Sequence, residues 1–108
     1  MSGLAANELR LDPGAIDVRI GEGRTAEVLR NLCWYAFDRD TDEWAFITER
    51  MESLFGTRLE EPVFLPERGE IRLAYRDRSG TRLDISASGR GQQQTLLLLA
   101  HMAASPGS

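Results

Sequence analysis

The sequence contains no lysine, and all 13 of its basic residues are arginines. A Walker A phosphate loop needs its lysine, so this chain cannot form one by itself. The single cysteine, Cys33, excludes an internal disulfide, and together with the single histidine, His101, it is too little for a metal site. Cys33 lies near Leu29 and Leu32 in a predicted helix, and we expect it to be a small core residue.

No stretch of the chain approaches the roughly 18 consecutive apolar residues of a membrane span. The N-terminus also lacks the basic start and apolar core of a signal peptide, so we expect a cytoplasmic protein with no membrane partner. The formal net charge of −4 leaves no overall basic footprint for nucleic acid. A length of 108 residues with 42% apolar residues indicates one globular domain or part of one.

The N-terminal segment 1–23 has no clear period and is expected to be irregular. Asp12-Pro13-Gly14 predicts a turn, and the alternation of apolar and charged residues over 16–20 predicts a short half-buried strand. The chain then changes to the helical period, and residues 24–56 predict a helical hairpin.

The first helix of this hairpin is expected to begin near Thr25, with the threonine hydroxyl as its N-cap. The second is expected to begin at Asp40, which has capping-box spacing to Glu43, and to end at Gly56. Residues at helical spacing predict the buried faces: Val28, Leu29, Leu32, Cys33, Ala36 and Phe37 in the first helix, and Trp44, Ile47, Met51, Leu54 and Phe55 in the second.

Residues 57–69 predict a connector that contains a short edge strand around 63–65. From residue 70 the period changes to two, and an antiparallel β-hairpin is expected, with its turn at 77–80. Its polar side carries Arg72, Arg76, Arg78 and Arg82. These arginines are expected to form a solvated face balanced by Glu70, Asp77 and Asp84; the alternative is a contact with nucleic acid.

The hairpin leads into a turn rich in serine and glycine, residues 86–91, and then into an apolar helix over 92–104 that is expected to be largely buried. A strand, a turn and a helix in this order direct free backbone N–H groups and the helix dipole at one point, where an anion can bind. A hydrolase nucleophile elbow is rejected, because both glycines of Gly-x-Ser-x-Gly are missing around Ser88 and the base would have to be His101. A dinucleotide fingerprint is rejected because Gln94 stands in place of its third glycine.

The same segment resembles the signature region of ABC-type ATPases. It reads Ile85-Ser86-Ala87-Ser88-Gly89-Arg90-Gly91-Gln92-Gln93-Gln94-Thr95-Leu96, and it is most similar to the AAA/ABC branch related to structural-maintenance-of-chromosomes, RecF-like and OLD-like proteins. Residues 23–32 look like the helical insertion of such heads, and the arginine-rich hairpin looks like the strands that lead into the signature helix. The resemblance implies an α+β portion of a P-loop NTPase head: a helical hairpin, then an antiparallel β-hairpin, then a long buried signature helix.

The family implies a composite ATP site in a dimer of heads, in which the signature turn of one head closes over the γ-phosphate of ATP and Mg²⁺ held by the other. The residues that match are Ser86, Ser88, Gly89, Arg90, Gly91 and Gln92. Gly89 stands where the family more often has its serine, so either Ser86 or Ser88 could be the serine that contacts phosphate. No catalytic residue and no Mg²⁺ ligand is expected within residues 1–108.

This resemblance predicts that the chain is a fragment, with Walker A upstream of it and the Walker B strand directly after Ser108. We therefore expect the parent protein to be an ATPase in DNA repair, recombination or defence, with DNA as a candidate partner, and the isolated chain to be inactive. The alternative is a non-enzymatic module that binds protein or DNA through its helical hairpin and arginine-rich β-hairpin.

Overall fold

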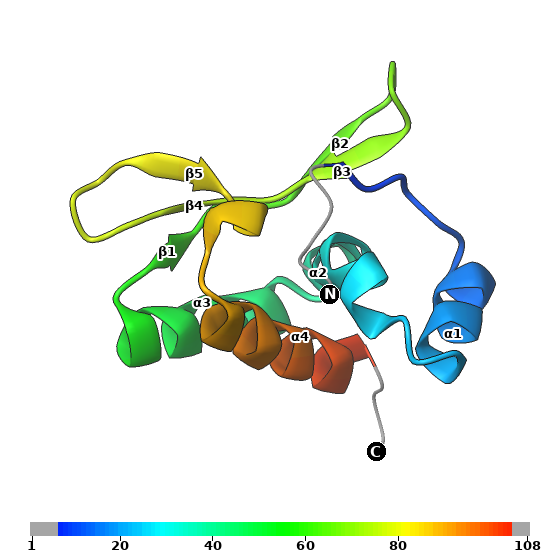
Figure 1. Cartoon of the computed structure of the whole chain (residues 1–108), viewed down its shortest axis with the longest axis horizontal. Helices are drawn as coiled ribbons and strands as arrows, with labels where there is room; N and C mark the ends of the chain where they lie inside the picture. The colour runs from blue at the N-terminus through cyan, green and yellow to red at the C-terminus, as the bar shows by residue number, and fades with distance from the viewer. Residues whose placement is uncertain (1–6, 105–108) are drawn as a thin grey trace.

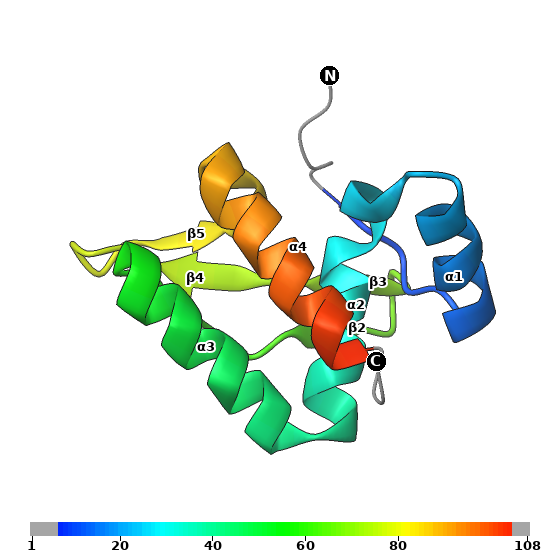
Figure 2. The same ribbon diagram turned by 90° about the horizontal axis from the view of Figure 1, so that it is seen from below.

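A layer of strands lies over a layer of helices in the computed structural model, which describes residues 7–104 (Figure 1). Helix α1 (Pro13–Gly21) lies at one end of the molecule. The helical layer consists of α2 (Leu29–Arg39), α3 (Thr41–Phe55) and α4 (Arg90–Ala104), which pack on one another. Figure 2 shows α3 and α4 covering the strands from the helical side.

Helices α2 and α3 form the expected helical hairpin. The Asp40 carboxylate accepts a hydrogen bond from the backbone N–H of Asp42 at 2.9 Å, which caps α3. Gly56 ends α3 in the left-handed conformation, with a φ of 74°. Both predicted ends of this helix are confirmed. Glu43 does not complete a capping box, because its carboxylate pairs with Arg39 at 3.3 Å.

The strand predicted over 16–20 is wrong, because these residues belong to helix α1. Asp12 is extended at the N-cap position, and Pro13 fits the first helical position because its fixed φ suits a helix and its missing N–H needs no partner there. Only Ile16 of this helix is buried, whereas Val18 is 58% exposed. The alternating residues 16–20 therefore belong to a helix that is only weakly amphipathic. Residues 1–6 of the segment that was expected to be irregular lie outside the described part of the chain.

The predicted N-cap at Thr25 is also wrong. Thr25–Val28 forms a 3-10 helix, η1, with no side-chain cap, and α2 begins only after it. The preceding residue, Arg24, instead donates to the Glu27 carboxylate at 2.8 and 2.9 Å, which holds this turn from outside.

The hydrophobic core lies where the three helices of the layer meet the strands. Cys33 is fully buried, which confirms its predicted place in the core. Leu54, expected to be buried, is 54% exposed, and α4 is not buried all round, because Leu98 and Met102 are 60% and 64% exposed. The buried apolar residues that form this core cluster are Ile16, Val28, Leu29, Leu32, Cys33, Ala36, Trp44, Ile47, Met51, Leu73, Tyr75, Ile85, Leu96 and Ala100.

Within residues 7–104, five short strands form two antiparallel sheets. In the first, β4 (Ala74–Arg76) lies between β1 (Arg58–Leu59) and β5 (Arg82–Asp84). In the second, β2 (Val63–Leu65) pairs with β3 (Glu70–Arg72). The edge strand expected around 63–65 is thus confirmed.

The β-hairpin predicted from residue 70 is right only in its second half. β4 pairs with β5, with Tyr75 opposite Leu83, but β3 pairs with β2 rather than with the chain after the turn. The reason is that the returning strand ends at Asp84, where the 3-10 helix η2 (Ile85–Ala87) begins. After the bond from Ile85 N–H to the Leu73 carbonyl, no returning strand is left for β3.

Two of the four arginines of the hairpin are balanced by a different acid from those predicted. Arg76 and Arg82 both donate to the Glu60 carboxylate, at 2.9 and 2.6 Å. Asp77 instead accepts hydrogen bonds from Ser79 inside the turn. Asp84, the third predicted acid, pairs with an arginine of α2.

Gly56→Ala should lower the free energy of unfolding by about 1–2 kcal/mol, because a Cβ is strained in the left-handed conformation. It should also cost more than Gly80→Ala, because an added Cβ at Gly56 would meet the Arg78 side chain. Gly80 has a similar φ of 88° but open space around it, which makes it the matched control. Urea unfolding measures both values. Equal losses would show that the packing of Arg78 over Gly56 does not restrict this position.

Candidate functional site

The turn between β5 and α4 begins with a cap supplied by Asp84. Its carboxylate accepts a hydrogen bond from the Ser86 backbone N–H at 2.9 Å and from the Ser86 hydroxyl at 2.6 Å. An aspartate that binds the backbone two residues further on is a common way to close a turn, and here it opens η2. Asp84 is thus the residue that converts the end of a strand into the turn.

The second serine of the turn is held from inside the protein. Ser88 is 9% exposed, and its hydroxyl donates to the Ile85 carbonyl at 2.7 Å. The Ser88 carbonyl in turn accepts from Gln93 Nε2 at 2.8 Å. Both serine hydroxyl protons, on Ser86 and Ser88, are therefore engaged with acceptors of the chain itself.

The outer part of the turn, residues 89–91, is exposed and forms the start of α4. The Gly89 carbonyl accepts from the Gln93 N–H at 3.0 Å, so Gly89 is the N-cap residue. In the described part of the chain no acceptor is found for the backbone N–H groups of Gly89, Arg90 and Gly91, as expected for the first turn of a helix. These N–H groups and the positive end of the helix dipole can together bind an anion.

The Arg90 side chain adds a full positive charge at the same point. It is exposed, and no carboxylate of the described residues forms an ion pair with it. The glycines on both sides leave space for a large anion to approach the backbone. Of the six predicted site residues, the structure thus brings Gly89, Arg90 and Gly91 together on the surface, and it places the two serines beneath them.

Gln92 is half-buried, and the glutamine that braces the turn is its neighbour Gln93. Sequence reasoning missed this residue although a signal existed. Gln93 is three and seven residues before Leu96 and Ala100, the two buried residues of α4, so it lies on the helix face that meets the protein.

An ion pair between a buried arginine and the half-buried Asp84 connects the turn to the helical layer, and sequence reasoning missed it as well. Arg30 of α2 is 1% exposed, and its Nη2 donates to the Asp84 carboxylate at 2.9 Å. Its Nη1 lies 3.6 Å from the carboxylate of Glu8, which is also buried. We call residues 7–12, which precede α1, the N-terminal arm. Arg30 therefore lies between this arm and the turn.

Glu8 is itself fixed by backbone contacts. Its carboxylate accepts from the N–H groups of Arg30 and Asn31 at 3.0 and 2.6 Å, and its backbone carbonyl accepts from the Ile71 N–H at 2.9 Å. Burial raises the pKa of Glu8, although the hydrogen bonds from Asn31 and Arg30 act against that rise. The arm is thus attached both to α2 and to β3.

The pKa of Asp84 is lowered. Burial acts to raise it, but the hydrogen bonds from Ser86 and the charge of Arg30 together outweigh burial. The ionised form of Asp84 is therefore the form that holds the turn.

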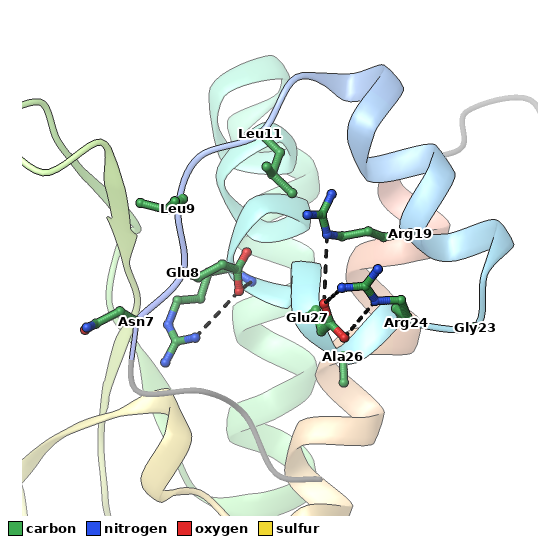
Figure 3. Close-up of a pocket in the computed structure, with 10 residues that line it drawn as sticks. Asn7, Glu8, Leu9, Leu11, Arg19, Gly23, Arg24, Ala26 and Glu27 are labelled. Carbon is green, nitrogen blue, oxygen red and sulfur yellow. Dashed lines mark hydrogen bonds and ion pairs between the residues drawn. The ribbon is translucent and has the colours of Figure 1, made fainter.

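A pocket of about 500 Å³ opens beside the arm, between η1 and α1 (Figure 3). Glu27 bridges two arginines at its rim, Arg24 at 2.8 Å and Arg19 at 3.9 Å, so these charges largely compensate one another. No residue of the turn lines this pocket. It is a separate feature from the candidate site.

Residues 7–104 contain no group of three or more histidine, cysteine, aspartate or glutamate side chains placed to hold a metal ion. Within the same residues, none of the helices has the length and apolar character needed to cross a membrane.

Comparison with protein-family models, with curated proteins and with solved structures finds no match to this chain.

The stabilisation that Asp84 provides should disappear in acid. Because its pKa is lower in the folded than in the unfolded chain, its contribution is complete above the ordinary value of 3.8 and is lost as the pH falls through the folded value. The difference in unfolding free energy between the wild type and Asp84→Asn should therefore shrink as the pH falls below 3.8. Urea unfolding at several pH values measures it. Asp38→Asn, at an exposed position, is the control, and a pH-independent difference for Asp84→Asn would contradict the assignment.

Proposed function

We propose that this chain forms part of an ATP-binding and ATP-hydrolysing AAA/ABC-type ATPase and contributes the signature turn that contacts the γ-phosphate of ATP across a dimer of heads. One observation carries the proposal: residues 89–91 present free backbone N–H groups and the Arg90 side chain at the exposed start of the 15-residue helix α4. A γ-phosphate carries several negatively charged oxygens and needs donors that are already in place, which this turn offers.

The groups of the turn divide into binding groups and supports. The backbone N–H groups of residues 89–91 would donate to phosphate oxygens, and Arg90 would neutralise charge that develops as the γ-phosphoryl group is transferred. Ser86 and Ser88 would act as supports, because their hydroxyl protons are engaged at 2.6 and 2.7 Å and a phosphate oxygen also needs a donor. Gln92, the remaining site residue, would lie at the edge of the bound nucleotide.

The other half of the site must come from elsewhere in the assembly. The lysine and the phosphate loop that hold ATP, the ligands of Mg²⁺ and the catalytic glutamate would be supplied by Walker A and Walker B segments, since this chain has no lysine. We place the assembly in the cytoplasm, as a homodimer of heads with a role in DNA repair, recombination or defence.

The alternative, a module that binds DNA through the arginine-rich hairpin, has less support. Arg76 and Arg82, two of its four arginines, share the Glu60 carboxylate, so only one of these two charges is left for a phosphate backbone. Among the described residues, Arg72 and Arg78 of the hairpin and Arg90 of the turn form no ion pair with a carboxylate. Of these three, Arg90 stands at a helix N-terminus that adds free backbone N–H groups, which favours the ATPase role.

Arg90→Ala in the complete ATPase should lower kcat by at least about 10-fold, because a positioned cationic donor at a transferring phosphoryl group commonly contributes more than this. ATP binding to a single head should remain, because the nucleotide is held by the other half of the site. Steady-state hydrolysis and a fluorescent-nucleotide titration measure the two effects.

Arg68→Ala is the matched control, since Arg68 is an exposed arginine in the turn between β2 and β3. It should leave kcat unchanged. Equal activity of Arg90→Ala and wild type would contradict the proposal, and so would ATP turnover by the isolated 108-residue chain.

A further inference from the structure

We propose that Arg30 is a positioning residue for the signature turn: it fixes Asp84, and through Asp84 the cap at Ser86, so the exposed N–H groups of the turn keep their direction only while this ion pair is intact. The inference rests on the proposed function for its catalytic consequence, but the coupling between Arg30 and the turn can be tested in the chain alone.

The first support is the burial of the charge. Arg30 is 1% exposed, and leaving a buried guanidinium without a carboxylate partner is strongly unfavourable. Its Nη2 donates to Asp84 at 2.9 Å, across 54 positions of sequence. The end of β5 must therefore stay where Arg30 can reach it.

The second support is that Asp84 accepts further hydrogen bonds besides the one from Arg30. Asp84 accepts from Arg30 and from the Ser86 N–H and hydroxyl through the same Oδ2 atom. A displacement of this oxygen toward or away from Arg30 therefore changes the cap of η2 directly. Charge-assisted hydrogen bonds that share one carboxylate in this way are short and directional.

The third support is that Arg30 is itself held in place by Glu8 of the N-terminal arm. Its own backbone N–H donates to Glu8 Oε1 at 3.0 Å, and its Nη1 lies 3.6 Å from the same oxygen. The guanidinium thus has one contact on the arm and one on the turn, which a planar group with several donors can make and a lysine ammonium cannot make as well.

This inference is tested with Arg30→Lys, Asp84→Asn and the double variant of the 108-residue chain. Arg30→Lys keeps the charge but loses the planar fork, and Asp84→Asn keeps a capping oxygen but loses the charge. Water-exchange NMR of the Ser86 amide reports the cap. Each single variant should speed its exchange by about 10-fold, the weight of one charge-assisted hydrogen bond, and the double variant should exchange no faster than Asp84→Asn alone.

The Ser79 amide gives an internal control, because it donates to Asp77 at 2.9 Å in the same kind of turn and has no contact with Arg30. Its exchange should not change in any variant. Unchanged exchange of the Ser86 amide in Arg30→Lys would overturn the inference. A double variant in which the two increases in exchange rate multiply would also overturn it, because Arg30 would then act independently of Asp84.

Should Arg30→Lys fail to fold, Asp84→Asn still tests the inference, because the Asp84 side chain is 37% exposed and the asparagine keeps an oxygen that can accept from Ser86. The Nη signals of Arg30 in the wild type should be separate, because its guanidinium is held in the ion pair, and they should shift or merge in Asp84→Asn. Unchanged signals would overturn the inference.

The catalytic consequence is measured separately in the complete ATPase. Arg30→Lys should lower kcat while the KM for ATP stays the same, because the turn and not the nucleotide pocket is disturbed. A coupled change in Ser86 exchange with an unchanged kcat would uphold Arg30 as the residue that positions the turn, and it would overturn the proposed contact of that turn with phosphate.

Discussion

The ion pair between Arg30 and Asp84 is the constraint on which the candidate site depends. Arg30 is almost completely buried, and the protein can keep its charge there only if carboxylates approach from both sides. That requirement brings Glu8, at the start of the described chain, and Asp84, near its end, to the same helix. The N-terminal arm, the helical layer and the turn are consequently one connected structure.

The turn follows from this constraint together with ordinary helix chemistry. Once Asp84 is fixed, its carboxylate closes η2, Gln93 holds the Ser88 carbonyl, and α4 must begin at the exposed glycines. A helix that begins at the surface leaves its first N–H groups without partners. Protein groups therefore satisfy the inner side of the turn, and the outer side is left to an external acceptor, which in our proposal is a phosphate held by another head.

How much of the fold and of the site could be predicted depended on how far apart the interacting residues lie along the sequence. The start of α3 at Asp40 and its end at Gly56 were predictable because capping acts over a few residues. The segment 16–20 was predicted to be a strand because its short alternation of apolar and charged residues fits the period of a strand as well as that of a helix. Asp12, the N-cap residue of this helix, was predicted to belong to a turn. The motif located the turn, but Arg30 and Asp84 are 54 positions apart, and no local pattern pairs them.

The central claim is that residues 89–91 face the γ-phosphate of an ATP held by another head. A photoreactive ATP analogue with its reactive group on the γ-phosphate, added with Mg²⁺ to the complete ATPase, measures this directly when the labelled peptides are mapped by mass spectrometry. The account predicts labelling within residues 88–92, in trans to the head that holds the nucleotide, and much less labelling in Arg90→Ala. Labelling confined to the pocket beside Arg19 and Arg24, or no labelling of this chain at all, would contradict it.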